Sequence, residues 1–159
     1  MLITGEYFDY RNPDPSAITI PALAAGLRAV RFNGQTSRLI TIAEHSLRVD
    51  RFVRLLYPEQ IDKPYALLHD AHEALVPWGD CLSFGKTDEQ RAVELQVDKI
   101  IRVSLGVPEP DERWLEQIKI ADDYAFRLEA VCWQPCAVGW NLGDIPDEIV
   151  RAFPEARGE

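Results

Sequence analysis

The chain of 159 residues has no hydrophobic run near the ~20 residues that a membrane-spanning helix requires. Its first residues, Met1 to Glu6, show no basic start followed by an apolar block, so they do not have the pattern of a secretory signal. The 47% of hydrophobic and 27% of charged residues are typical of a globular protein. We therefore expect a cytoplasmic protein that does not enter a membrane.

Positive charge is scarce. Lys and Arg number 17 against 26 Asp and Glu, which gives a net charge of −9. Binding along a nucleic acid polymer depends on neutralising phosphates, so this balance argues against such a partner. A small phosphorylated substrate is still compatible, because a metal ion and a few local cations reverse the field inside one pocket.

Cysteine is also scarce, with Cys81, Cys132 and Cys136 in the whole chain. An odd number of cysteines without an export signal does not predict a disulfide framework. A metal site at Cys132 and Cys136 would need two further soft ligands, and no Cys-x-x-Cys motif supplies them. We expect packing thiols.

No alternation of apolar and polar residues is long enough to indicate a β-sheet, and no internal repeat is present. Helical periodicity predicts an all-α fold, a single compact helical bundle with its core over about residues 18–133. An irregular segment, 1–17, precedes this core, and a tail, 134–159, follows it. The expected helices span 22–30, 41–56, 64–76, 88–105, a segment from a cap at Asp111 to 131–133, and a short stretch near 147–153, with loops over 33–37 and 79–87.

Histidine is rare as well, and two of the three histidines stand close together. His69, Asp70, His72 and Glu73 fall within little more than one turn of an otherwise apolar predicted helix. So many ionisable side chains on a helix that must pack are costly unless they pair or bind a cation. An isolated His-Asp pair would usually face solvent, so the other helices decide its interpretation.

Two of those helices also turn a potential ligand inward. His45 lies on the apolar stripe of the helix over 41–56, and Asp122 on the inward side of the last long helix, whereas Asp123 lies on its solvated side. Three segments that each direct a ligand toward the core favour a shared divalent metal. Two imidazoles and two carboxylates suit Mn²⁺, Co²⁺, Fe²⁺, Zn²⁺ or Ni²⁺. The inward stripe of the last helix is Leu115, Ile118, Asp122, Phe126, Glu129 and Trp133.

The order His…His-Asp…Asp resembles that of the HD-domain metal-dependent phosphohydrolases. The surrounding residues are similar to the 5′-deoxynucleotidases of this family and their phage-type relatives, over about residues 5 to 130. The segments that carry the resemblance are Arg31-Phe32-x-Gly34-x-Thr36, Ile42-Ala43-Glu44-His45-Ser46, Leu68-His69-Asp70-Ala71-x-Glu73-Ala74 and Ala121-Asp122.

The resemblance implies one divalent transition metal (Co, Mn, Zn, Fe or Ni) in an HD-domain bundle, held by His45, His69, Asp70 and Asp122. It also implies a general acid and base role for Glu73 and a phosphate-binding role for Arg31. Phe32 is expected either to pack on the sugar, disfavouring a 2′-hydroxyl, or to be a core residue. Asp80 and Lys86 match a catalytic aspartate and a substrate-binding lysine of the family.

The chain departs from the family pattern in three places. Pro77-Trp78 lengthens the interval between Glu73 and Asp80, and Asp80-Cys81-Leu82-Ser83-Phe84 replaces a proline-rich stretch. His72 replaces a small residue, and we expect it beside the metal ligands or at the surface rather than on the metal.

The resemblance implies hydrolysis of deoxynucleoside 5′-monophosphates to nucleoside and phosphate. One alternative is a deoxynucleoside triphosphohydrolase that releases triphosphate and needs more cations, for which Arg28, Arg31, Arg38 and Lys86 are candidates. A second is a non-catalytic nucleotide-binding protein, against which the intact Glu73 and Arg31 argue. Base preference and assembly into a homo-oligomer stay open.

Overall fold

The computed structural model describes residues 1–60, 63–81, 83–134, 137 and 139–157. These residues form helices and turns without a β-strand, and one isolated bridge joins Val30 to Thr41, so the predicted all-α class is confirmed. The α-helices are α1 (Ile20–Gly26), α2 (Ile42–Leu56), α3 (Tyr65–Leu68), α4 (Asp88–Leu105), α5 (Glu112–Trp133) and α6 (Asp147–Arg151). Single 3₁₀ turns are η1 (Pro15–Ala17), η2 (Arg31–Gly34), η3 (Pro58–Gln60), η4 (Ala71–Ala74), η5 (Ser83–Gly85) and η6 (Pro154–Arg157).

The long helices begin at side-chain caps. Thr41 and Glu44 form a reciprocal capping box at the start of α2, and Thr87 and Gln90 form another at the start of α4. Asp111 caps α5, as predicted, by accepting a hydrogen bond from the backbone N–H of Trp114 at 2.9 Å. These caps fix where each helix starts and therefore which residues its inner face presents.

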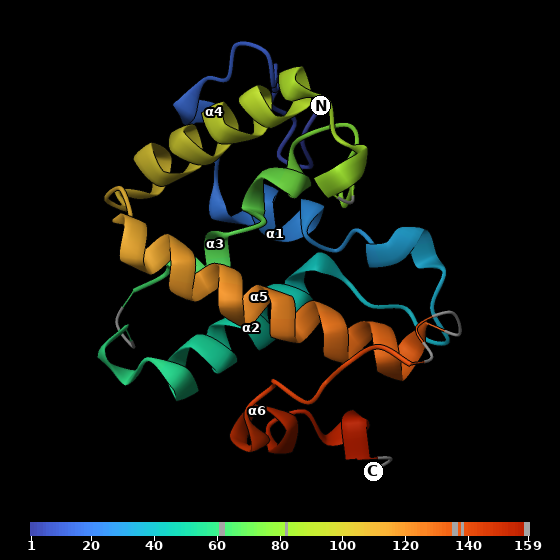
Figure 1. Ribbon diagram of the computed structural model, residues 1–159. Coiled ribbons are helices and arrows are strands. Elements are labelled where there is room, and N and C mark those ends of the chain that lie inside the picture. The colour runs from blue at the N-terminus through green and yellow to red at the C-terminus, as the bar shows by residue number, and fades with distance from the viewer. Residues whose placement is uncertain (61–62, 82, 135–136, 138, 158–159) are drawn as a thin grey trace.

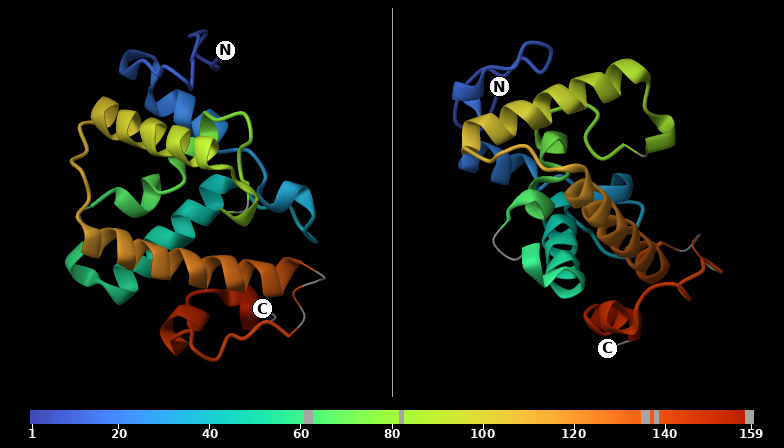
Figure 2. Two further views of the ribbon diagram at one scale, coloured as in Figure 1. Left: turned by 45° about the horizontal axis from the view of Figure 1, so that its top comes forward. Right: turned by 60° about the vertical axis from the view of Figure 1, so that its left-hand side comes forward.

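The helices form two halves around two apolar clusters. In the first half, α2 and α5 pack together and α6 closes one side, with Phe52, Leu128 and Phe153 in the core (Figure 1). In the second half, α4 and the N-terminal segment enclose Ala71 and Val97. The views in Figure 2 keep α4 and the N-terminus on one side of the molecule and α6 on the other. The short α3 and the turn η4 lie at the junction of the halves.

Both terminal segments contribute to the apolar clusters. Phe8 and Ala17 are buried in the second half, and Ile149 and Phe153 of the tail are completely or almost completely buried in the first. The short helix near 147–153 was predicted, and packing is the role that the structure gives it. No helix of the described residues is both long enough and apolar enough to cross a membrane.

Two predicted helices are shorter than expected. The helix predicted over 22–30 ends at Gly26, and the one over 64–76 stops at Leu68 and resumes after Asp70 as the turn η4. Successive side chains of a helix point about 100° apart, so an unbroken helix would direct His69 and Asp70 to different neighbours. The backbone of Asp70, at φ −108° and ψ 16°, breaks the helix and directs both side chains to one centre.

Other sequence expectations have mixed outcomes. Leu115 was predicted to face the core but is 54% exposed, and it lines a cavity beside Leu68 and Ile118. Residues 31–34, partly assigned to a loop, form η2. Cys132 is a free, partly buried thiol and Cys81 is partly buried, whereas Cys136 lies outside the described residues.

Close packing of α1 against η4 explains why α1 ends in glycine. A Cβ atom added to Gly26 would lie 2.6 Å from the Cβ atom of Ala74. We expect Gly26→Ala to lower the free energy of unfolding by about 1–3 kcal/mol, because η4 must shift. Chemical denaturation measures this change. Gly85→Ala is the control, since its new Cβ would meet only the Cys81 Sγ at 3.7 Å; equal stability of both variants would contradict the close contact.

Candidate metal centre

Four side chains from three segments converge where the two halves meet. His45 comes from the first turns of α2, His69 and Asp70 from the break after α3, and Asp122 from the middle of α5. One potential ligand atom from each lies within 4.8 Å of all the others. These are the four residues that the sequence predicts as ligands, and together they could hold a metal ion.

The imidazoles face the carboxylates through their Nε2 atoms. His45 Nε2 lies 2.9 Å from Asp122 Oδ1 and 3.6 Å from Asp70 Oδ2. His69 Nε2 lies 3.1 Å from Asp70 Oδ2 and 3.7 Å from Asp122 Oδ1, yet it is buried without a hydrogen-bond partner. Two nitrogens and two oxygens thus surround one point.

The other ring nitrogen of each histidine is fixed by an acceptor. His45 Nδ1 lies 3.1 Å from the buried carboxylate of Glu129, and His69 Nδ1 lies 2.7 Å from the carbonyl oxygen of Ala66. An imidazole that donates from Nδ1 presents a lone pair at Nε2, the arrangement usual for metal-ligating histidines. The donor set and the partnerless His69 Nε2 therefore fit a divalent cation.

The charges of the cluster are strongly coupled. Burial raises the pKa of Asp70, but the imidazoles of His69 and His45 and the Arg31 guanidinium outweigh burial and hold that pKa well below its usual range. Burial lowers the pKa of His69, whereas the carboxylates of Asp70 and Asp122 raise it well above the usual value. Both carboxylates are thus ionised, and a bound cation would displace protons from the imidazoles.

Glu129 supports the cluster from behind. Its side chain is fully buried on α5 and lies 3.0 Å from Arg48 Nη1 and 3.4 Å from Arg31 Nε, as well as against His45. Burial raises the pKa of Glu129, but the hydrogen bond from His45 and the charges of the two arginines outweigh burial and hold that pKa below its usual value. The sequence places Glu129 on the inward stripe of the last long helix but predicts no role for it. A charged residue on that apolar stripe, two turns after Asp122, was the signal that could have identified it.

Glu73 lies next to the cluster. It is 6% exposed, and its Oε2 atom is buried without a hydrogen-bond partner. Burial, with the charges of Asp70 and Asp80, raises its pKa to about 8. A buried carboxyl group of this kind can hold a proton close to the ligands.

Arg31 and Asp80 also reach the cluster. Arg31 Nη1 lies 3.3 Å from Asp70 Oδ2 and 3.7 Å from Asp80 Oδ1, so carboxylates hold this buried guanidinium in place. Asp80 accepts a hydrogen bond from the backbone N–H of Phe32 at 2.7 Å. Phe32 has a positive φ of 53°, which is unusual for a bulky residue, and its ring stacks on Phe126 at 5.7 Å.

Two of the remaining candidates pair with acids outside the four ligands and one is exposed, whereas His72 lies beside the ligand Asp70. Lys86 Nζ binds Glu94 at 2.9 Å, and Arg38 pairs with Glu44 and lies over the ring of Trp133. Arg28 is exposed. His72 is buried, with its Nδ1 atom 3.1 Å from Asp98 on α4, so the expectation of a surface position is wrong and that of a position beside the ligands is correct.

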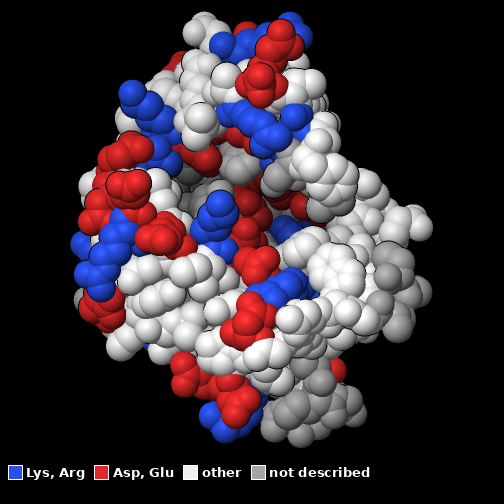
Figure 3. All heavy atoms as spheres, viewed as in Figure 1, with Lys and Arg blue, Asp and Glu red and all other residues white. Residues whose placement is uncertain are grey.

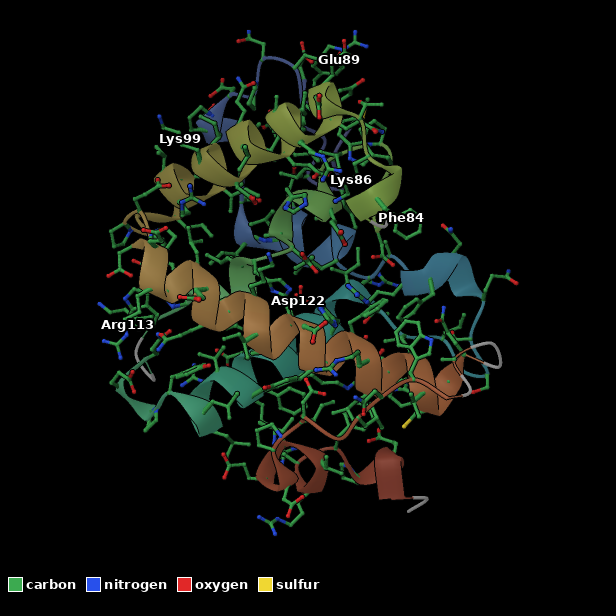
Figure 4. The ribbon with its side chains drawn as sticks, viewed as in Figure 1. Phe84, Lys86, Glu89, Lys99, Arg113 and Asp122 are labelled. Atoms are coloured by element: carbon green, nitrogen blue, oxygen red, sulfur yellow. The ribbon has the colours of Figure 1, made fainter. Side chains whose placement is uncertain are left out.

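The cluster is open to solvent on one side. The Asp122 side chain is 39% exposed and points from α5 toward the space below α4 (Figure 4). Figure 3 shows a hollow there, between the two halves, with acidic side chains in its depth and basic ones around them. A cavity of about 110 Å³ adjoins His69 and is lined in part by Leu68, Asp98 and Ile118.

Comparisons with known proteins do not identify a relative. No model of a known protein family matches the chain, and no curated protein matches it closely.

The role of Glu129 is testable by Glu129→Gln, which keeps the shape of the side chain but removes its charge. We expect the affinity for Mn²⁺ or Zn²⁺ to fall about 10–100-fold, because His45 loses the carboxylate that orients it. The unfolding free energy should also fall by about 3 kcal/mol, since the buried Arg31 and the partly buried Arg48 lose a charged partner. Calorimetric titration and denaturation measure both effects. Glu116→Gln, on the exposed side of α5, is the control, and wild-type affinity in Glu129→Gln would contradict the supporting role.

Proposed function

We propose that this protein is a metal-dependent phosphohydrolase of deoxynucleotides that converts deoxynucleoside 5′-monophosphates to nucleoside and phosphate. The observation that carries the proposal is the convergence of His45, His69, Asp70 and Asp122, with both imidazoles fixed through Nδ1. The resemblance to the HD-domain 5′-deoxynucleotidases supplies the substrate class.

The reaction breaks the bond between phosphorus and the sugar oxygen and forms one between phosphorus and a water oxygen. The water loses a proton and the leaving oxygen gains one. A divalent cation at the four ligands would polarise the phosphoryl oxygen and lower the pKa of water. Glu73 can carry the transferred proton, because its Oε2 atom is buried beside the cluster and has no competing hydrogen bond.

Arg31 can orient the phosphate. Its guanidinium lies against the ligand Asp70 and is held by Asp80 and Glu129, so it needs little reorganisation to accept phosphate oxygens. Asp80 acts mainly by holding Arg31 and the backbone of Phe32. The preference for deoxy substrates rests on the resemblance at Phe32, whose strained backbone fixes its ring beside Arg31.

A triphosphohydrolase is the alternative with the same metal site. Triphosphate carries more negative charge and requires more cations. Among the described Lys and Arg side chains, Arg31 is the one that forms an ion pair with a ligand of the cluster, whereas Lys86 binds Glu94 and Arg38 binds Glu44. This distribution favours the monophosphate. A purely structural site would not need a partnerless buried carboxyl group such as Glu73, which argues against a non-catalytic protein.

The test is incubation of Mn²⁺- or Co²⁺-loaded protein with a panel of ribo- and deoxynucleoside mono- and triphosphates, with chromatographic separation of the products. We expect nucleoside and inorganic phosphate from deoxynucleoside monophosphates. Release of intact triphosphate from deoxynucleoside triphosphates would contradict the monophosphatase and identify the protein as a triphosphohydrolase. Absence of turnover by folded, metal-loaded protein would contradict an enzymatic function.

A matched variant series shows whether the activity belongs to this site. Glu73→Gln should lower kcat about 10²–10⁴-fold while a metal ion still binds at His45, His69, Asp70 and Asp122, because proton transfer is lost. Asp123→Asn is the control, since this carboxylate is exposed beside Asp122 and pairs with Arg127. Unchanged kcat in Glu73→Gln would exclude Glu73 as the proton carrier.

A further inference from the structure

The third histidine belongs to a second group of ligands beside the first. Asp70, His72 and Glu73 each offer a potential ligand atom, and these atoms lie within 4.8 Å of one another. His72 is 7% exposed and Glu73 is 6% exposed. His72 Nε2 and Glu73 Oε2 are both buried without a hydrogen-bond partner. Two buried polar atoms close together, both without a hydrogen-bond partner, require an explanation.

His72 is held in the same way as the two histidines of the first group. Its Nδ1 atom lies 3.1 Å from Asp98 Oδ1, as that of His45 lies against Glu129 and that of His69 against the Ala66 carbonyl oxygen. Each ring thus has its Nδ1 atom engaged and its Nε2 atom available. Glu94 Oε1 lies 3.9 Å from His72 Nε2, beyond hydrogen-bond distance, and it already accepts from Trp78 and Lys86.

The charge of the hollow points to a further cation. Among the described residues, seven carboxyl groups lie in the two groups or beside them: Asp70, Glu73, Asp80, Glu94, Asp98, Asp122 and Glu129. Three cationic side chains of the described residues pair with them: Arg31, Arg48 and Lys86. Metal ligands are neutral imidazoles and ionised carboxylates, so once Glu73 has lost its proton four negative charges are unbalanced. One divalent ion would offset half of this excess. The remaining negative charge would repel an anionic phosphate that approaches the same place.

We propose that Asp70, His72 and Glu73 bind a second divalent cation, with Asp70 shared between the two sites. The imidazole and carboxylate ligands suit Mn²⁺ or Zn²⁺. Asp98 is a positioning residue that orients His72. A carboxylate has two oxygens, so Glu73 can bind the ion through one and face the reacting proton with the other. This proposal rests on the first metal site, because Asp70 belongs to both.

The test is equilibrium dialysis of the full chain against Mn²⁺, combined with electron paramagnetic resonance. The wild type should bind two ions with an exchange-coupled spectrum, because the Asp70 carboxylate links them. His72→Gln should bind one ion with an uncoupled spectrum. Asp98→Asn should weaken the second ion about 10–100-fold and leave the first in place. Asp123→Asn, an exposed acid, should behave as the wild type.

The failures of the two sites are distinguishable. A wild type that binds no ion overturns the first site and the second with it. A wild type that binds one ion, or two ions that both persist in His72→Gln and Asp98→Asn, overturns the second site alone. Loss of both ions from folded His72→Gln would show that His72 supports the first site, which also overturns the proposal.

Discussion

The hydrogen bond between His45 and Glu129 joins the two longest elements of the first half at a point that water does not reach. Both side chains are completely buried. Burying a carboxylate costs several kcal/mol unless it is paired. Arg31 and Arg48 complete the pairing, and they extend the network from the surface of α2 to the ligand Asp70. The position of His45 thus depends on the buried Glu129 carboxylate and on the two arginines that pair with it.

The two halves of the molecule contribute different parts of the site. The half with α2 and α5 supplies His45, Asp122 and Glu129. The half with α4 supplies Asp98 and Glu94, which pairs with Lys86. The segment that follows α3 lies at the junction: its break supplies His69 and Asp70, and the turn η4 supplies His72 and Glu73. A cation at this junction would connect the halves, and it would stabilise the folded state because the unfolded chain has no such site.

The sequence predicted the parts of this arrangement that depend on local patterns. Helical periodicity indicated that His45 and Asp122 face inward, and the side chain of Asp111 marked a helix start that the structure confirms. The order of the four ligands also predicted that they would meet. The inward faces and the helix start follow from residues a few positions apart, whereas the expected meeting of the four ligands rests on the resemblance to the HD-domain family.

Features that depend on distant contacts could not be predicted in this way. The helix breaks at Asp70, so that the adjacent side chains of His69 and Asp70 point to one centre. The helical periodicity of this segment does not indicate the break. The pairing of His72 with Asp98 and of His45 with Glu129 joins segments far apart in the chain. The positive φ of Phe32 follows from the hydrogen bond to Asp80, and no local signal marks it.

The most direct test of the central claim is a crystal structure of the protein grown with Mn²⁺ or Zn²⁺, with an anomalous difference map recorded at the metal edge. The account predicts a strong peak bonded to the Nε2 atoms of His45 and His69 and to carboxylate oxygens of Asp70 and Asp122. A map without a peak at these four residues, from protein saturated with the metal, would contradict it.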